Sequence, residues 1–336
     1  MDEIQPPSAM KILIIRLSSI GDIVLTTPVI RAIKTQYPMA ELHYLVKKNM
    51  KDVLAYNPHI DKLHLYDSEH VAELIKTLAE ENYDTVVDLQ NNHRSRQVCH
   101  RLHISSLTFR KLDFKKWICV YLKLNLLPDE HIVNRYFETV RLLGVSNDHK
   151  GLEFYIPENG VFEEEDFPMV FEDGFVAVVM AGAHATKRIP TSKVIEIGRI
   201  LHKPVMLLGG KDVQAAGEEV ENALGERAYN GCGQYSLFQT ASIIQQADCV
   251  ITGDTGLMHI AAAFQKPTAV LWGNTIPEFG MYPYMPGQRK QFRNFEVCPL
   301  QCRPCSKLGH KQCPHKHFKC MQDIPALEVA EWVNKF

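Results

Sequence analysis

The chain has 336 residues, a length that exceeds the usual size of one hydrophobic core and favours two domains. Its composition, 46% hydrophobic and 23% charged with a formal net charge of -2, is that of an ordinary globular protein and gives no general sign of nucleic-acid binding. No apolar stretch approaches the roughly 18 residues of a membrane span, and the N-terminus M-D-E-I-Q-P-P-S-A-M lacks the features of a secretion signal. We therefore expect a cytoplasmic protein.

In the first half, short β-branched runs alternate with amphipathic stretches, a pattern typical of parallel sheets built from strand-helix-strand units. Residues 1–9 are expected to be a disordered lead-in. A helix is predicted to follow Asp22 and to end at Tyr37, before Pro38. The predicted strands of this half lie near 11–15, 42–46, 62–66 and 85–89.

The second half repeats the alternation, with predicted strands near 175–180, 205–208, 249–251 and 268–271. The loop-like segment 155–172 separates an N-terminal domain, 10–160, from a C-terminal domain, 175–325. The amphipathic end of the chain, 326–336, is predicted to be a helix, with packing back on the N-terminal domain as one option. Two parallel sheets joined in this way place ligands in a cleft at their carboxyl edges.

The sharpest motif is Ile251-Thr-Gly-Asp-Thr-Gly-Leu-Met-His259, which follows a buried strand and opens a helix. Its glycines allow a tight turn, and Asp254 or Thr255 can cap the helix. The amides of Thr255, Gly256 and Leu257 would then face an anion at the positive end of the helix dipole. A capped helix without a ligand is the simpler alternative, and His259 is equally well explained as a packed core histidine.

A second motif, Gly182-Ala-His-Ala-Thr-Lys-Arg-Ile-Pro190, follows the first strand of the second half. Thr186 and Lys187 are suited to bind phosphate oxygens, and Pro190 can begin the next helix. Taken alone, a loop lysine is most often solvated. Opposite the 253–257 turn, Lys187 becomes a counter-charge for a diphosphate. Asp212, after Gly209-Gly210-Lys211, is a candidate ribose contact.

These segments resemble the heptosyltransferases, glycosyltransferase family 9, which build the inner core of lipopolysaccharide. The resemblance covers most of the chain from Met10 onward, and Ile189 and Asn274 stand where the family usually has tryptophan and often has proline. The matching segments are R-L-S-S-I-G-D-I-V-L-T-T-P (16–28), Y-D-T-V-V-D-L-Q-N-N-H-R-S (83–95), G-A-H-A-T-K-R-I-P (182–190), T-G-D-T-G-L-M-H-I-A-A-A (252–263) and A-V-L-W-G-N-T-I-P (269–277).

The resemblance implies an α/β fold of GT-B type, with two facing Rossmann-like domains and an interdomain cleft. The acceptor would lie on the N-terminal domain and the nucleotide-sugar, with ADP-heptose as the first expectation, on the C-terminal domain. The family's catalytic base corresponds to Asp22, and its lysine and aspartate in the two turn motifs correspond to Lys187 and Asp254. We expect the acceptor to contact Ser18, Ser19, Gly21, Arg94 and Arg96.

The implied reaction is an inverting sugar transfer, in which Asp22 takes the proton of the attacking hydroxyl while Lys187 and the amides at 255–257 stabilise the leaving diphosphate. No D-x-D motif for metal-diphosphate binding is present, so catalysis is expected to need no metal cofactor. An alternative role for Asp22 is to cap the helix that begins at Ile23.

Two further features suggest partners. Between His93 and Arg135 there are nine lysines and arginines but only three acidic residues. This stretch is either a solvated helical face or a basic patch. Such a patch would bind an anionic lipid-linked acceptor or a membrane surface, which we expect to be the cytoplasmic face of the inner membrane. The C-terminal region is rich in cysteine, and Cys302-Arg-Pro-Cys305 has the spacing of zinc ligands. Either reduced thiols or a structural zinc would explain this region, and the candidate zinc ligands are Cys302, Cys305, Cys313 and Cys320.

Two other classes of protein are alternatives. A nicotinamide-dependent oxidoreductase would need G-x-G-x-x-G after the first strand, and the nearest match, Gly231-Cys-Gly233, comes late and lacks the third glycine. A zinc-bearing module that binds nucleic acid or protein would use the cysteines and the basic stretch. The near-neutral charge and the two complete α/β halves argue against that module, and we expect no nucleic-acid partner.

Overall fold

The computed structural model describes residues 10–163, 165 and 167–336, and the chain divides into two compact units. Unit 1 contains the chain up to Lys111 together with Glu130–Tyr155. Unit 2 contains Leu112–Asp129 and Ile156–Phe336. The boundary near 155 agrees with the linker expected from the sequence. The short segment 112–129, however, belongs to the second unit, although the sequence pattern placed it in the first domain.

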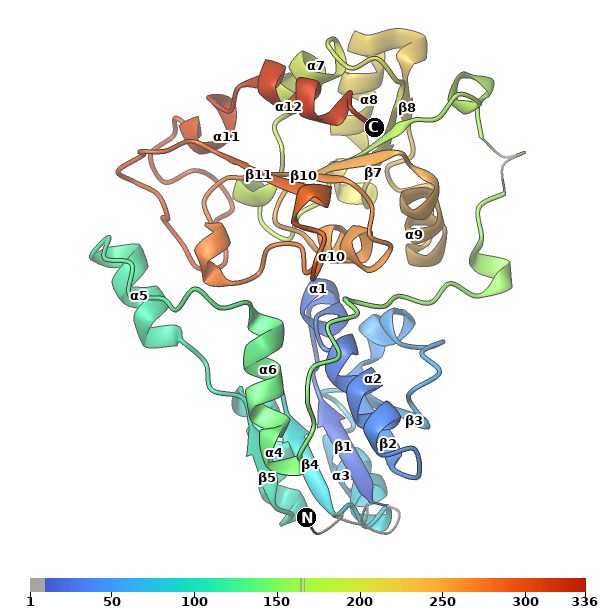
Figure 1. The fold of residues 1–336 in the computed structure, drawn as a ribbon, viewed down its shortest axis with the longest axis vertical. Helices are drawn as coiled ribbons and strands as arrows, with labels where there is room; N and C mark the ends of the chain where they lie inside the picture. The colour runs from blue at the N-terminus through green and yellow to red at the C-terminus, as the bar shows by residue number, and fades with distance from the viewer. Residues whose placement is uncertain (1–9, 164, 166) are drawn as a thin grey trace. The chain divides into compact units, whose positions relative to one another are not determined.

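Unit 1 is built on a five-stranded parallel sheet (Figure 1). The strand order is β3-β2-β1-β4-β5, so the chain leaves β1 toward one side and later returns to its other side. The strands are β1 (Lys11–Ile15), β2 (Glu41–Lys47), β3 (Lys62–Tyr66), β4 (Thr85–Asp88) and β5 (Ser106–Thr108).

The helices of unit 1 pack in two pairs, because side chains of a buried strand alternate between the two faces of the sheet. Leu13 and Ile15 lie in one hydrophobic cluster with residues of α3 and α4, and those helices contact each other. Helices α2 and α6 form the other pair. The helices are α1 (Ile20–Val24), α2 (Thr27–Gln36), α3 (Val71–Glu80), α4 (His93–Leu102) and α6 (Ile132–Val140).

Unit 2 has a six-stranded parallel sheet in the order β11-β10-β9-β6-β7-β8. Read from β6, the first strand of this unit, this is the strand order of a doubly wound Rossmann sheet. The strands are β6 (Val176–Val179), β7 (Val205–Leu208), β8 (Ala228–Asn230), β9 (Cys249–Thr252), β10 (Thr268–Trp272) and β11 (Phe292–Glu296).

The main core of unit 2 forms between this sheet and helices α7, α8 and α12. Helices α9 and α10 contact each other, and Met258 of α10 packs on Val270 and Trp272 of β10. The helices are α5 (Asp113–Tyr121), α7 (Thr191–Gly198), α8 (Gln214–Leu224), α9 (Leu237–Gln246), α10 (Gly256–Ala263), α11 (Lys319–Gln322) and α12 (Ala326–Val333).

All eight predicted strands are present. Among the described residues, the strands that the sequence pattern missed are β5, β8 and β11, and each lies at an edge of a sheet. Edge strands are half-solvated and need no continuous apolar run, so their sequences resemble loops. The predicted helix after Asp22 is two helices, α1 and α2, with a break at Leu25 and Thr26.

The C-terminal helix α12 belongs to the core of unit 2. Val329, Ala330 and Trp332 are buried in the same cluster as β6 and β7. The side chain of Asn334 accepts a hydrogen bond from the amide of His202 at 2.9 Å. The helix therefore closes one face of the unit 2 sheet. Within the described part of the chain, no helix is both long and apolar enough to span a bilayer.

The packing of α12 predicts a difference between two of its residues. Trp332→Ala should lower the free energy of unfolding by about 3–5 kcal/mol, because it leaves a cavity in the unit 2 core. Leu327→Ala, at a position that is 55% exposed on the same helix, should change it by less than about 0.5 kcal/mol. Denaturant titration of both variants measures the free energy of unfolding. Equal losses of stability in the two variants would contradict the burial of Trp332 in the unit 2 core.

Candidate functional site

The sequence motifs lie at the point in each sheet where the strand order changes direction, between two adjacent strands whose following helices lie on opposite faces. In unit 1 this point is between β1 and β4, and in unit 2 it is between β6 and β9. The loops that leave the carboxyl ends of such a pair of strands diverge to opposite faces and leave room for a ligand. The candidate site of each unit is therefore at this edge of its own sheet.

In unit 1, Asp22 is held by two partners from its own loop. Its Oδ1 pairs with the guanidinium of Arg16 at 2.5 Å, and its Oδ2 accepts hydrogen bonds from the Ser19 amide at 3.1 Å and hydroxyl at 2.8 Å. Ser19 is the N-cap of α1, and Asp22 is the third residue inside that helix. This corrects the alternative in which Asp22 itself caps a helix beginning at Ile23. The carboxylate belongs to a capping-box arrangement at the start of α1.

Arg16 links this loop to the loop after β4. Its side chain is buried, and it donates to the carbonyl of Leu89 at 2.6 Å as well as pairing with Asp22. Burial acts to lower the pKa of Arg16, but the negative charge of Asp22 and its other neighbours raises it above the ordinary value. The guanidinium is therefore a permanent buried cation that fixes the Asp22 carboxylate. Sequence reasoning did not single out this residue, although it opens the quoted motif.

The loop after β4 is fixed by two polar side chains that sequence reasoning also missed. The side-chain oxygen of Gln90 accepts from the amides of Leu17 at 2.9 Å and Ser18 at 3.3 Å. Asp88 is fully buried and accepts from the Gln90 amide and from the Ser95 hydroxyl at 2.9 and 2.8 Å. A buried carboxylate is stable only with such partners, so the two loops form one rigid edge.

The predicted acceptor residues divide into two groups, of which one follows β1 and the other follows β4. In the first group, the Ser19 hydroxyl contacts Asp22, and Gly21 is buried in α1. In the second group, both arginines are exposed at the start of α4, and Arg96 donates to the side chain of Asn91 at 2.8 Å. The structure therefore places the whole predicted set at one edge of the unit 1 sheet, namely Ser18, Ser19, Gly21, Arg94 and Arg96.

In unit 2, the two glycine-containing loops meet. The Lys187 ammonium and the Asp254 Oδ2 form an ion pair at 2.6 Å, with both side chains mostly buried. The Thr275 hydroxyl, after β10, donates to the same Asp254 oxygen at 2.9 Å. Gly253 is required here, because a Cβ at this position would collide with the carbonyl oxygen of Lys187. Lys187, Asp254 and Thr275 thus join the ends of three adjacent strands.

Helix α10 begins directly beside this ion pair. Thr255 is its N-cap, and the Thr255 hydroxyl accepts from the Met258 amide at 3.4 Å. The first amides of a helix have no partner within the helix, so Gly256 and Leu257 begin an edge suited to an anion. His259 lies one turn further along and is only 2% exposed, which agrees with the packed core alternative for that residue.

The cysteine-rich region lies over the same loops. Arg303 donates to the carbonyls of Gly273 and Thr275 at 2.8 and 3.0 Å, and the Cys305 amide donates to the carbonyl of Asn274. The region therefore fixes the chain after β10, a role that no sequence pattern indicated.

Two predicted donor contacts have other partners. The Thr186 hydroxyl accepts from the His310 amide at 2.8 Å, and Thr186 is buried. Thr186 therefore anchors the cysteine-rich region, and its contact with a phosphate stays a prediction. Asp212 forms an ion pair with Arg188, so it neutralises a neighbouring side chain, and its contact with a ribose stays a prediction.

The four predicted zinc ligands share one region of the fold, since Cys302, Cys305 and Cys313 lie close enough to Cys320 for their charges to affect its pKa. In the same region the Cys302 sulfur lies 3.8 Å from the His317 Nε2. Among the described residues, two groups place three or more potential ligand atoms within 4.8 Å of one another, and neither contains a cysteine. Burial raises the pKa of Cys320 to about 12, which disfavours its thiolate. A zinc site at Cys302, Cys305, Cys313 and Cys320 stays a prediction.

Comparison with known proteins finds relatives that match this chain over most of its length. The lipopolysaccharide heptosyltransferase 1 of Campylobacter coli is 26% identical over 289 residues, covering 79% of this chain and 84% of that protein. The glycosyl transferase family 9 structure from Veillonella parvula has a TM-score of 0.77 at 20% identity and covers 98% of this chain and 97% of that one. The structure of the E. coli ADP-heptose lipopolysaccharide heptosyltransferase II has a TM-score of 0.73 at 21% identity, covering 97% and 98%.

These structures share the GT-B fold of two Rossmann-like domains, as the resemblance implied. The model of glycosyltransferase family 9 (heptosyltransferase) matches residues 71–318, which is well over half of the chain. The match includes both loops that meet at Lys187 and Asp254. The chain therefore belongs to glycosyltransferase family 9, the heptosyltransferases.

Proposed function

We propose that this protein transfers a heptose from ADP-heptose to a saccharide acceptor of the lipopolysaccharide core, with inversion at the transferred carbon. Family membership carries this proposal, because the relatives are named for heptose transfer to lipopolysaccharide and one for its ADP-heptose donor. The charged groups support it, since each unit holds a carboxylate or an ion pair at the edge where Rossmann-like sheets bind ligands. The oxidoreductase and the binding module have no such support.

In the proposed mechanism, Asp22 is the general base. It accepts the proton of the acceptor hydroxyl as that oxygen attacks the anomeric carbon. A carboxylate has about four acceptor positions, so bonding to Arg16 and Ser19 does not by itself prevent this contact. Arg16 and Ser19 orient the carboxylate. The residues proposed to lie against the acceptor are Ser18, Ser19, Gly21, Arg94 and Arg96.

The donor is proposed to bind at the unit 2 edge. The diphosphate gains negative charge as the sugar departs, and Lys187 together with the amides at the start of α10 would stabilise that charge. Asp254 orients the Lys187 ammonium through their ion pair. We propose that this arrangement replaces a divalent metal in catalysis. Asn274 is buried beside Thr275, and within the described chain its amide group makes no hydrogen bond, so a polar donor group could satisfy it.

The acceptor is proposed to be lipid-linked, and the protein to touch a membrane surface through α5. One side of this helix and the chain after it expose large apolar residues, with Phe114 and Trp117 stacked and Tyr121 next to Trp117. Exposed apolar groups of this kind mark an interaction site rather than a solvated face. Lys115 on the same helix is exposed and matches an anionic headgroup. The exposed set is Phe114, Trp117, Tyr121, Leu122, Leu124 and Leu126.

The first test concerns the base. Asp22→Asn keeps a side chain that can serve the start of α1, but it cannot take a proton, so kcat should fall by roughly 10²–10⁴-fold with donor affinity retained. Ser236→Ala is the control, since it removes the N-cap hydroxyl of α9, a residue outside both proposed sites. It should lower stability by about 1 kcal/mol and change kcat far less. Turnover of Asp22→Asn equal to wild type would show that the carboxylate is structural only.

The second test concerns the donor site. Lys187→Ala should slow transfer by roughly 10²–10³-fold and weaken ADP binding, because it removes charge that stabilises the leaving diphosphate. Asp254→Asn should act in the same direction by releasing Lys187. Lys290→Ala, at an exposed position of the same unit, is the control and should change neither quantity. All assays contain EDTA, and the wild-type protein should keep its turnover there because the proposed mechanism needs no metal. Unchanged ADP affinity in both site variants would place the donor elsewhere.

The third test concerns α5. Co-sedimentation with vesicles that contain anionic lipid should retain the wild-type protein at low salt and release it as salt rises. The double variant Trp117→Ala, Tyr121→Ala should bind at least about tenfold more weakly. Leu142→Ala, at a position that is 81% exposed on the other unit, should bind like wild type. Equal retention of all three proteins would remove α5 as the contact.

A further inference from the structure

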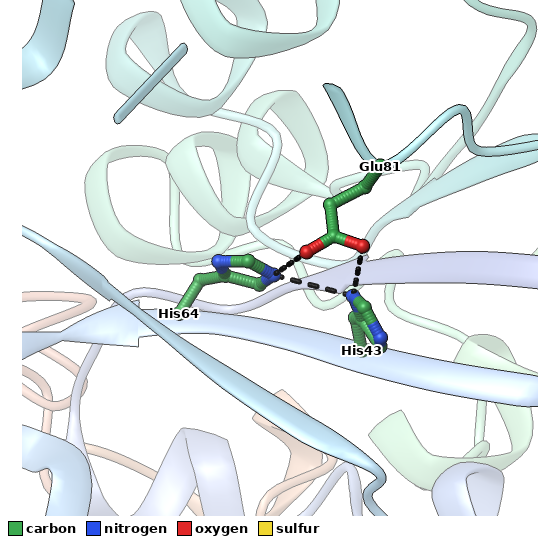
Figure 2. A group of neighbouring side chains, drawn as sticks. All are labelled: His43, His64 and Glu81. Carbon is green, nitrogen blue, oxygen red and sulfur yellow. Dashed lines mark hydrogen bonds and ion pairs between the residues drawn. The ribbon is translucent and has the colours of Figure 1, made fainter. Parts of the chain in front are cut away.

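A cluster of titratable side chains lies at the amino ends of the unit 1 strands, the opposite end of the strands from Asp22. His43 comes from the first half of β2, His64 from the middle of β3, and Glu81 from the chain between α3 and β4 (Figure 2). Both imidazoles are almost fully buried, with exposures of 1% and 5%. The proposed transfer reaction uses none of these residues, so their convergence calls for a separate explanation.

The hydrogen bonds of His43 determine which of its nitrogens is a donor. Its Nε2 lies 2.8 Å from a carboxylate oxygen of Glu41. An ionised carboxylate can only accept, so Nε2 carries the proton and the Nδ1 of the neutral ring has a lone pair. This Nδ1 faces the Nε2 of His64 at 3.2 Å. A carboxylate behind one ring nitrogen and a lone pair on the other is the arrangement found in metal-bound histidine.

The distances suit a small divalent ion. Two ligands about 2.0–2.1 Å from a tetrahedral zinc are about 3.3 Å apart, close to the separation of the two imidazole nitrogens. Each oxygen of Glu81 lies 3.9 Å from one of these nitrogens, a short side-chain movement from ligand distance. The Tyr83 hydroxyl lies 2.8 and 3.0 Å from the two nitrogens and is placed beside a fourth position.

The protonation states are those that a metal needs. Burial lowers the pKa of His43, and it lowers that of His64 to about 4, so both rings are neutral at physiological pH. Hydrogen bonds from Lys11 and Lys62 lower the pKa of Glu81 to about 2, so it is a carboxylate.

We propose that His43 Nδ1, His64 Nε2 and Glu81 form a binding site for a divalent transition metal, with zinc as the best match. Two imidazoles and one carboxylate are ligands that zinc accepts, and Glu41 acts behind His43 to hold the ring. The site joins the amino ends of β2 and β3 to the chain that enters β4. Its role is structural, since it lies at the other end of the strands from the candidate acceptor residues.

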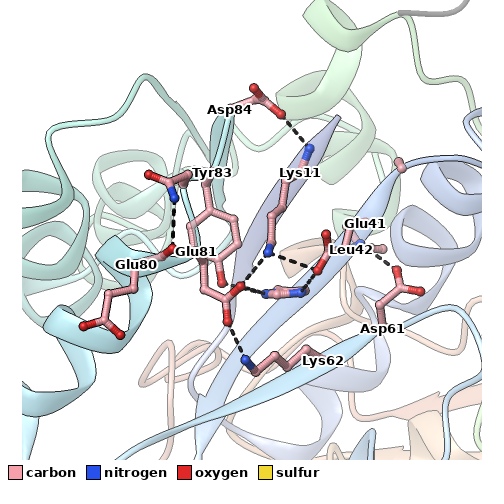
Figure 3. Close-up of polar contacts among 12 residues, drawn as sticks. Lys11, Glu41, Leu42, Asp61, Lys62, Glu80, Glu81, Tyr83 and Asp84 are labelled. Carbon is pink, nitrogen blue, oxygen red and sulfur yellow. Dashed lines mark hydrogen bonds and ion pairs between the residues drawn. The ribbon is translucent and has the colours of Figure 1, made fainter. Parts of the chain in front are cut away.

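Two lysines compete with the metal for Glu81. Lys11 lies 2.5 Å from one oxygen, and Lys62 contacts the other (Figure 3). Without metal, the cluster is a satisfied chain in which His64 donates to Tyr83 and Tyr83 to His43. Metal must therefore displace an ammonium group, and Lys62 is the one that can leave, because half of its side chain is exposed. Removal of its charge should tighten binding.

The test uses the full-length protein stripped with EDTA and then titrated with Zn²⁺, with bound metal counted by elemental analysis after dialysis. The wild type should hold one more equivalent than His64→Gln, and zinc should raise its melting temperature by several degrees more. Lys62→Met, which leaves all proposed ligands in place, should bind this equivalent at least about fivefold more tightly. His70→Gln is the control, since it alters the separate exposed group of Asp67, Glu69 and His70.

Spectra of the Co²⁺-loaded protein separate this site from the cysteines, because a nitrogen and oxygen site lacks the thiolate charge-transfer band. Wild type and Lys62→Met should show Co²⁺ absorption without the thiolate charge-transfer band, and His64→Gln should lose this absorption. Equal zinc content in wild type and folded His64→Gln would overturn the proposal. So would a Lys62→Met protein that binds no more tightly than wild type, a result that does not depend on whether the histidine variant folds. Neither result bears on heptose transfer.

Discussion

The parallel direction of the strands is the constraint on which the rest of this structure depends. Because every strand of a sheet runs the same way, all loops that follow strands emerge at one edge, and two adjacent strands whose helices lie on opposite faces leave that edge open. In unit 1 these are β1 and β4, and in unit 2 they are β6 and β9. Motifs that are about 70 residues apart in sequence thereby become neighbours within each unit.

Charges at these edges are held by opposite charges, since a partly buried ion without a partner is costly. Arg16 forms an ion pair with Asp22 in unit 1, and Lys187 forms one with Asp254 in unit 2. The two pairs suit different tasks. The guanidinium of Arg16 fixes the position of a carboxylate that has further acceptor positions, whereas the ammonium of Lys187, oriented by Asp254, can turn its remaining hydrogens toward a diphosphate. Arg303 and the cysteine-rich region then hold the second edge rigid.

The two ends of the unit 1 strands have separate chemistry. The carboxyl ends present Asp22 and the proposed acceptor residues, while the amino ends gather His43, His64 and Glu81 with two lysines. Two buried imidazoles whose facing nitrogens lie 3.2 Å apart do not contribute to a hydrophobic core. A bound metal would explain why polar groups occupy positions that aliphatic side chains could fill.

The sequence by itself determined the two α/β units, eight of the strands, the family and the turns that carry Asp22, Lys187 and Asp254, because strand periodicity, glycine spacing and helix starts are local properties of the chain. Only the tertiary structure decided which side chains meet. The partners Arg16, Gln90 and Thr275, the anchoring of Thr186 by His310, and the cluster around His43 all join segments with no fixed spacing. Edge strands and the packing of α12 were also decided there, since burial depends on what the rest of the chain covers.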